Sequence, residues 1–287
     1  MAYRSSPRPT FTAPTAIPYS SVTRYLWGDD ESGRVNDWIY ASSGKIHQLV
    51  FGLPAGTGFR HSESFRTVFG ADEVLIVVQG GMIIANPETG EVQIAQKGEA
   101  VLFRKDTWHN AFALPGEELR VLEYFAPPPS TGTSGKYAQT RPYVSNSKFS
   151  RDAFLGRWPE ASADAASTGH FALIGKAARL WTMRSGDPRA LVGIIASTDQ
   201  LTAAEIQLAP GGRTAETRHG GDAVLYVAEG RPNVLLPGAD GGPDWFELAP
   251  GDGFFVPEGF AYQIYNMGTV PAVAYLGAAP AFDVAAP

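Results

Sequence analysis

The chain of 287 residues contains no cysteine. Disulfide frameworks, zinc–thiolate sites, iron–sulfur clusters and thiol nucleophiles are therefore excluded, and any metal ion must be held by imidazole and carboxylate groups. Charged residues are also sparse: Asp, Glu, Lys and Arg make up 18% of the chain, the formal net charge is −6, and no run of Lys or Arg occurs. We therefore expect no nucleic-acid partner.

Long apolar runs are missing as well. No stretch approaches the roughly 18 apolar residues that a membrane-spanning helix needs. Residues 1–20 are rich in Pro, Ser and Thr and lack the apolar segment of a signal peptide. A cytoplasmic protein without a membrane partner is expected.

Short segments rich in β-branched and aromatic residues are plentiful, and each is bounded by Gly, Pro or Asn. Examples are residues 45–53, 72–81, 119–125, 203–210, 223–230 and 253–259. This pattern predicts an all-β fold, and the 32 Gly and 22 Pro fit many turns between short strands. Only residues 151–168 and 177–184 predict short helices.

The two halves of the chain repeat each other. "LPAG" at residues 53–56 leads to "ADEVLIVVQG" and then to "GEAVLFRKDTWHNAF", while "LAPG" at residues 208–211 leads to "GDAVLYVAEG" and "GDGFFVPEGFAYQIYN". His109 follows Gly98 by eleven residues, and Tyr262 follows Gly251 by the same number. The repeat indicates that the chain contains two copies of one fold. A Pro-, Gly-, Ser- and Thr-rich segment at residues 126–143 predicts a boundary near Ser145.

These segments resemble the two motifs of the cupin superfamily. One motif runs Gly, His-x-His, three or four residues, Glu, six residues, Gly; the other runs Gly, five residues, Pro-x-Gly, two residues, His, three residues, Asn. The resemblance covers residues 45–125 and 203–276 and implies a bicupin, two double-stranded β-helix (jelly-roll) barrels with few short helices. We expect an N-terminal arm with the first strands over residues 1–44 and an N-terminal barrel over 45–145. A connecting segment with the first strands of the second barrel would follow over 146–202, and a C-terminal barrel over 203–287.

The resemblance also implies a metal site in the N-terminal barrel. His61 takes the first imidazole position and Glu63 replaces the second. Glu73 is followed by six residues and Gly80, as the motif glutamate is, and His109 takes the third imidazole position. The Pro-x-Gly turn before that imidazole reads Arg104-Lys105-Asp106 instead.

The C-terminal half keeps the turn residues and loses the ligands. Gly251, Pro257, Gly259 and Asn266 match the pattern, whereas the ligand positions read Thr217, His219, Ala223 and Tyr262. One imidazole without carboxylate neighbours holds a metal ion poorly, so this barrel is expected to be degenerate. Tyr262 is expected to fill the barrel with its ring and to form a hydrogen bond with His219.

The residue types independently favour a metal ion. Residues 61 and 63 are two apart, so a strand would direct both to one face. A buried carboxylate without a partner costs several kcal/mol, and a divalent cation would satisfy His61, His109 and Glu73 together. Two imidazoles and a carboxylate also leave coordination positions open for substrate and O2. We predict one divalent ion per chain, Fe2+ or Mn2+, with Zn2+ or Ni2+ as alternatives; Glu63 is either a ligand or a general base.

The first functional hypothesis is a metal-dependent oxidoreductase of the dioxygenase type that acts on a small organic substrate, aromatic or enolisable. An apolar pocket with Phe59, Leu75 and Val77 is predicted from their strand parity. The alternatives are a metal-dependent lyase or isomerase with Glu63 as general base, and a non-catalytic small-molecule-binding protein. A bicupin resembles a dimer of single cupin domains joined in one chain, so a monomer would suffice, whereas edge strands that pair between chains favour a homodimer.

Overall fold

The structure is a computed structural model that describes residues 6–129, 135–145, 171–183, 189–238 and 244–282. The helix expected at residues 151–168 lies outside these ranges. At residues 177–184 the helix prediction is wrong: a 3-10 turn at Lys176–Ala178 is followed by strand β13 (Leu180–Thr182). Among the described residues, no helix is long and apolar enough to cross a membrane.

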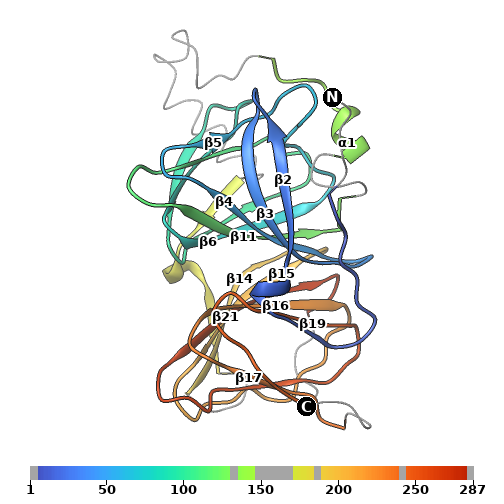
Figure 1. Cartoon of the computed structure of the whole chain (residues 1–287), viewed down its shortest axis with the longest axis vertical. Helices are drawn as coiled ribbons and strands as arrows, with labels where there is room; N and C mark the ends of the chain where they lie inside the picture. Colours follow the sequence, from blue (N-terminus) through green and yellow to red (C-terminus); the bar gives the residue numbers. More distant parts are fainter. Residues whose placement is uncertain (1–5, 130–134, 146–170, 184–188, 239–243, 283–287) are drawn as a thin grey trace. The chain divides into compact units, whose positions relative to one another are not determined.

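The chain divides into two compact units. The N-terminal unit comprises Met1–Arg8, Arg24–Ile39 and Leu49–Lys176, and the C-terminal unit comprises Pro9–Thr23, Tyr40–Gln48 and Ala177–Pro287. The described residues contain one α-helix, α1 (Gly135–Gln139), and a 3-10 turn at Tyr19–Ser21 besides the one at Lys176–Ala178. The rest of the regular structure is strands, so the predicted all-β fold is confirmed (Figure 1).

The first seven-stranded sheet has the order β12-β9-β6-β11-β4-β3-β2, and a four-stranded sheet has the order β5-β10-β7-β8. The bounds are β2 (Thr23–Asp29), β3 (Gly33–Ser42), β4 (His47–Leu53), β5 (Gly58–Phe59), β6 (Asp72–Gln79), β7 (Gly81–Ala85), β8 (Val92–Gln96), β9 (Ala100–Phe103), β10 (Asn110–Ala113), β11 (Leu119–Ala126) and β12 (Phe171–Ile174).

The second seven-stranded sheet has the order β1-β19-β16-β21-β15-β14-β13, and a three-stranded sheet has the order β18-β17-β20. The remaining bounds are β1 (Thr15–Ile17), β14 (Ala190–Ser197), β15 (Thr202–Leu208), β16 (Asp222–Glu229), β17 (Asn233–Leu235), β18 (Trp245–Glu247), β19 (Gly253–Val256), β20 (Gln263–Tyr265) and β21 (Ala272–Ala279).

The two large sheets repeat each other strand for strand. The first sheet contains the order β9-β6-β11-β4-β3-β2, and the second sheet contains the matching order β19-β16-β21-β15-β14-β13. The outer position beside β9 is taken by β12, and the one beside β19 by β1. Turn glycines repeat as well, since Gly80 and Gly230 have φ angles of 73° and 74°. The internal repeat in the sequence is therefore a repeat of the fold.

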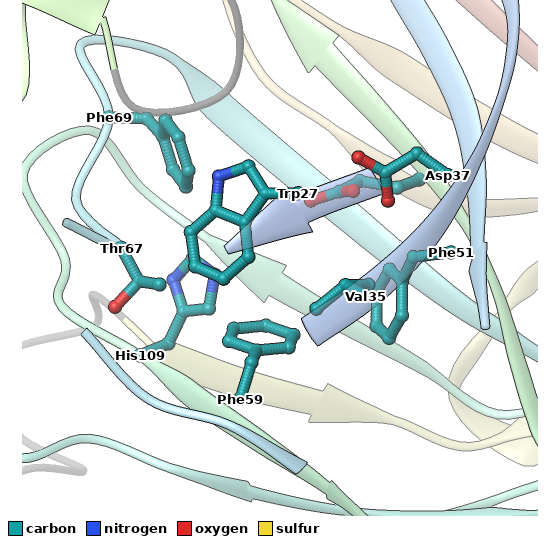
Figure 2. Close-up of a pocket in the computed structure, with 9 residues that line it drawn as sticks. Trp27, Val35, Asp37, Phe51, Phe59, Thr67, Phe69 and His109 are labelled. Atoms are coloured by element: carbon teal, nitrogen blue, oxygen red, sulfur yellow. The ribbon is translucent and has the colours of Figure 1, made fainter. Parts of the chain in front are cut away.

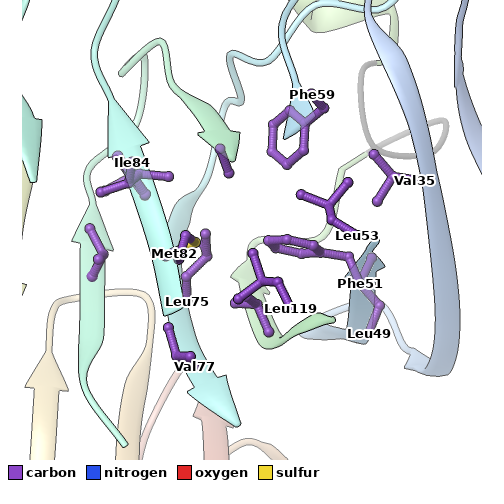
Figure 3. Packing of buried hydrophobic residues seen from close by; sticks show 14 of the residues in the cluster. Val35, Leu49, Phe51, Leu53, Phe59, Leu75, Val77, Met82, Ile84 and Leu119 are labelled. Carbon is purple, nitrogen blue, oxygen red and sulfur yellow. The ribbon is translucent and has the colours of Figure 1, made fainter. Parts of the chain in front are cut away.

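Each unit has its own apolar core. In the N-terminal unit the core includes Phe51 on β4, Leu75 and Val77 on β6, and Leu119 on β11, all at most 3% exposed (Figure 3). Alternate residues of a strand point to one face, so the apolar alternation of the sequence becomes an interior of interdigitating side chains. The packed core fixes the direction of the polar side chains on the same inner face.

The turn before His109 keeps its shape without the Pro-x-Gly sequence. Asp106 has a φ of 69°, close to the 78° of Gly259 at the matching turn of the C-terminal unit. Asp is one of the residues that tolerate this left-handed region. Here its carboxylate also accepts a hydrogen bond from the Tyr137 hydroxyl and pairs with Arg141.

Asn266, a motif residue of the C-terminal half, provides a stability test. Its side chain is 0% exposed; Nδ2 donates to the carbonyls of Leu208 (3.0 Å) and Val270 (2.8 Å), and Oδ1 accepts from the Gly268 amide (3.0 Å). Asn266→Ala leaves these backbone groups unpaired, so we expect the free energy of unfolding to fall by about 2 to 4 kcal/mol. Urea denaturation measures this, with the exposed Asn36→Ala as control. Equal stabilities of the two variants would contradict this role.

Candidate active site

A pocket opens inside the N-terminal unit, and aromatic rings form most of its wall. The lining side chains are Trp27, Val35, Asp37, Phe51, Phe59, Thr67, Phe69, His109 and Glu123. Figure 2 shows those of β2, β3, β4 and β5 converging with His109 on one space. The predicted apolar pocket is present and Phe59 lines it, whereas Leu75 and Val77 belong to the packed core.

Two glutamates reach this interior from neighbouring strands. β6 and β11 are antiparallel, and their register sets Glu73 opposite Phe125 and Glu123 opposite Leu75. Residues two apart share a face, so both carboxyl groups point inward with Leu75. Glu73 is 1% exposed and Glu123 is 6% exposed, and their carboxyl groups lie close enough for each to shift the pKa of the other. Glu123 faces the pocket, with Glu73 behind it.

His109 completes a chain of three polar groups. Its ring stacks on Phe103, with 4.4 Å between centroids and 25° between planes. Nδ1 lies 3.4 Å from the Thr107 carbonyl, so Nδ1 carries the hydrogen and Nε2 is left as an acceptor. Nε2 in turn lies 3.4 Å from Oε1 of Glu73. A protonated Glu73 can therefore share its hydrogen with either His109 or Glu123.

Burial shifts the pKa values of Glu73, Glu123 and His109 in the directions that favour their uncharged forms. Desolvation raises the pKa of Glu73 to about 7 and lowers that of His109 to about 4. It also raises the pKa of Glu123 well above its ordinary value, and the neighbouring charge of Glu73 adds to this. Burial, with a smaller effect of the Glu123 charge, raises the pKa of Asp37 on β3 in the same direction. A proton in this group therefore resides on the carboxyls rather than on the imidazole.

The other two predicted ligands have different surroundings. His61 is 8% exposed, but its Nε2 lies 2.6 Å from the Val144 carbonyl, and its ring packs edge-on against Trp108 and Tyr143. Glu63 is exposed on the surface. Of the four side chains, the structure brings together only Glu73 and His109.

The backbone register explains why His61 and Glu63 miss the site. In the C-terminal unit Thr217 pairs with Tyr262, and the Gly259 amide donates to the His219 carbonyl. In the N-terminal unit the His109 amide donates to the Thr67 carbonyl, and the Asp106 amide donates to the Phe69 carbonyl. Thr67 and Phe69 thus occupy the positions assigned above to His61 and Glu63, which lie six residues earlier in the chain.

The donor set at these positions does not match the four-ligand set that the cupin resemblance implies. It consists of Thr67, Phe69, Glu73 and His109, and only the last two are good ligands for a divalent ion. No group of three His, Asp or Glu side chains within the described ranges could hold a metal ion. Oε1 of Glu73 is buried without a hydrogen bond and faces Nε2 of His109, so the structure offers a pair of ligands rather than a complete site.

Sequence reasoning missed Asp37, Glu123, Trp27 and Thr67. Glu123 had a visible signal, an acidic residue within the apolar strand "LRVLEYF" at residues 119–125. Thr67 would have followed from aligning "TVFGADEV" at 67–74 with "TRHGGDAV" at 217–224. Asp37 and Trp27 stand in strands that resemble no motif, so only the fold reveals their part in the pocket.

The C-terminal unit has a pocket in the matching place without acidic residues. His219 Nε2 lies 2.7 Å from the Tyr262 hydroxyl, which confirms the expected hydrogen bond. Phe282 stacks on the His219 ring at 5.0 Å, and the other lining residues are mostly apolar. The position of Glu73 is taken by Ala223, and that of Glu123 by Leu276, which lies opposite Leu225. This pocket has no counterpart of the three-group chain.

Comparisons with known proteins agree with the fold. A family model described as the cupin domain matches residues 204–276. Among solved structures, a mutant of Bacillus subtilis oxalate decarboxylase aligns with a TM-score of 0.61 and 14% identity, over 94% of this chain and 78% of that one. The formate complex of Lactobacillus farciminis oxalate decarboxylase gives 0.61 and 15%, over 94% and 86%. No curated protein matches.

AerE from Microcystis aeruginosa has a similar structure as well, with a TM-score of 0.60 and 5% identity, over 90% of this chain and 97% of that chain. At these identities the likeness concerns the fold alone. The chain thus has an all-β, cupin-like fold, and the cupin-domain model matches part of its C-terminal half.

His61 and Glu63 allow a direct test of their structural roles. His61→Ala removes the hydrogen bond to the Val144 carbonyl, so we expect the free energy of unfolding to fall by about 1 to 3 kcal/mol. Glu63→Gln changes an exposed side chain and should alter it by less than about 0.5 kcal/mol. Denaturant titration and metal analysis of both proteins check this. Loss of a bound metal ion at unchanged stability would instead support the ligand role predicted from the sequence.

The raised pKa of Glu73 predicts a pH-dependent stability. The folded protein binds this proton more tightly than the unfolded chain does, so the stabilisation is full below the ordinary pKa of 4.5 and is lost as the pH rises to about 7. Glu73→Gln carries no such proton. Relative to the wild type, it should gain up to about 3 kcal/mol in unfolding free energy between about pH 5 and about pH 8.

Denaturant titrations at the two pH values measure this gain. The lowered pKa of His109 acts in the opposite direction but is common to both proteins and cancels in the difference. Exposed Glu117→Gln is the matched control and should give no such trend. A difference between Glu73→Gln and wild type that does not change with pH would contradict the raised pKa.

Proposed function

We propose that the N-terminal unit is an enzyme of the isomerase or lyase type, which moves a proton on a small organic substrate in its pocket. The observation that carries the proposal is the buried pair of Glu123 and Glu73 on neighbouring strands, which faces the pocket at one end and the acceptor nitrogen of His109 at the other. Such a group can take up and release a proton near neutral pH, as acid–base catalysis requires.

The pair works because two carboxyls at hydrogen-bond distance do not readily ionise together. Once one proton has left, with a pKa of about 7, one charge and one proton remain. In the free pair the pKa values place this charge on Glu73 and the proton on Glu123. Transfer of that proton from Glu123 to Glu73, whose Oε1 lies 3.4 Å from the acceptor Nε2 of His109, would leave the charge on Glu123. Glu123 is then the base on the side of the pocket, and Glu73 and His109 are positioning residues.

In the proposed reaction, the Glu123 carboxylate removes a proton from a carbon beside a carbonyl group. The C–H bond breaks, an O–H bond forms on Glu123, and the electron pair remains on the substrate as an enolate. Return of the same proton to another atom of the substrate completes an isomerisation. Alternatively, departure of a group from the neighbouring carbon completes an elimination. Neither course needs an oxidant or a second base.

The lyase or isomerase hypothesis from the sequence is thus retained, with Glu123 as the base in place of the exposed Glu63. The metal-dependent dioxygenase hypothesis has less support, because Thr67 and Phe69 stand where two of its ligands are needed. The proposed reaction therefore uses no metal ion. A non-catalytic binding protein would bind a ligand in this pocket without exchanging its carbon-bound hydrogen, so a measurement of exchange distinguishes it from the proposed enzyme.

Deuterium incorporation tests the proposed activity. We expect the protein to exchange a carbon-bound hydrogen of small ketones or keto acids with D2O, followed by NMR over a panel of such compounds. Glu123→Gln should lower the exchange rate at least about 100-fold, since it removes the base. Glu63→Gln, chelator treatment and exclusion of O2 should leave it unchanged. Exchange that persists in Glu123→Gln, or turnover that requires O2 or added Fe2+ or Mn2+, would contradict the proposal.

A further inference from the structure

Three carboxyl groups lie inside the N-terminal unit without a cationic partner from the protein. Asp37, Glu73 and Glu123 are 4%, 1% and 6% exposed. Within the described part of the chain, no Lys or Arg forms an ion pair with any of them, and the carboxyl group of Asp37 also forms no hydrogen bond. Asp37 and Glu123 both line the pocket. A buried, unpaired carboxyl group is costly, so a site that keeps two of them facing its cavity is suited to a ligand that pairs with them.

Aromatic rings form much of the remaining wall of the pocket, beside Val35 and Thr67. Trp27 meets Phe59 edge-on at 5.6 Å, and Phe51 meets Phe59 edge-on at the same centroid distance. Phe69 adds a fourth ring, and Figure 2 shows these rings around the space that Asp37 also borders. The negative faces of aromatic rings attract a cation that has left water, and they also pack well against a hydrocarbon body. Rings and carboxyls thus favour the same kind of ligand.

We propose that this pocket recognises a small organic ammonium, with the N–H groups directed at Asp37 and Glu123 and the hydrocarbon part against Trp27, Phe51 and Phe59. The inference rests on the proposed function, since it names the substrate class of the same site: an amine that carries an enolisable carbon. Charge-assisted hydrogen bonds to the carboxylates would hold the ammonium. The cation in turn would favour the ionised form of Glu123, the form that acts as base.

The same arrangement disfavours anions. A carboxylate ligand would meet Asp37 and Glu123 at close range, and no Lys or Arg is among the residues that line the pocket. Oxalate and formate, which appear in the names of two structurally similar proteins, are such anions. We therefore expect neither of them to bind in this pocket.

Three ligands of one shape and different charge test the proposal: benzylammonium, benzyl alcohol and benzoate, titrated by calorimetry into the full-length protein. We expect benzylammonium to bind at least ten-fold more tightly than benzyl alcohol, and benzoate not to bind. Asp37→Asn should lower benzylammonium affinity at least ten-fold and leave that of benzyl alcohol unchanged. The exposed carboxylate change Asp30→Asn is the matched control and should have no effect.

Trp27→Leu is a second variant, in case Asp37→Asn does not fold. This variant should weaken the binding of benzylammonium more than that of benzyl alcohol, because only the cation loses the attraction of the ring face. Equal or tighter binding of benzyl alcohol or benzoate would overturn the inference, as would an unchanged preference in both variants. Binding is measured without turnover, so an ammonium preference without deuterium exchange would refute the proposed reaction alone. Exchange without that preference would refute the ammonium specificity alone.

Discussion

The burial of carboxyl groups inside an apolar β-barrel is the constraint on which this structure depends. The antiparallel register of β6 and β11 directs Glu73 and Glu123 inward among core residues, and Asp37 enters from β3. Burial disfavours their charged forms, so the groups hold their protons, and Glu73 and Glu123 also shift the pKa of each other. The raised pKa of Glu73 and the acceptor state of His109 Nε2 both follow from this single condition.

The two units have the same fold, but the interior of the N-terminal unit contains ionisable groups where that of the C-terminal unit contains mainly apolar side chains. At matching positions, Glu73 and Glu123 are replaced by Ala223 and Leu276, and His109 is replaced by Tyr262. The C-terminal unit buries a satisfied His219–Tyr262 hydrogen bond and apolar side chains. A cupin-type barrel thus does not require a reactive interior, and the acidic residues of the N-terminal unit call for a functional explanation.

Part of the candidate site was accessible from the sequence and part was not. Glu73 and His109 were found because motif spacing was preserved on both sides of them, and the structure brings the two into contact. His61 and Glu63 lie outside the pocket because the N-terminal half has five additional residues at this place: Thr67 follows Gly56 by eleven residues, whereas Thr217 follows Gly211 by six. Spacing alone does not reveal where such an insertion is absorbed. Asp37 could not be predicted from the sequence, since the other residues that line the pocket lie on strands distant from it in the chain.

The sequence by itself determined the class of fold, the duplication and the places of the turns. Alternating apolar residues and repeated glycines are local signals, and each one predicts the strand or turn in which it lies. Only the tertiary structure decided which polar residues meet inside the N-terminal unit. That depends on the pairing of β6 with β9 and β11, where a shift of one residue exchanges the inner and outer faces. A buried cluster is a property of paired strands, so no single segment of the chain contains it.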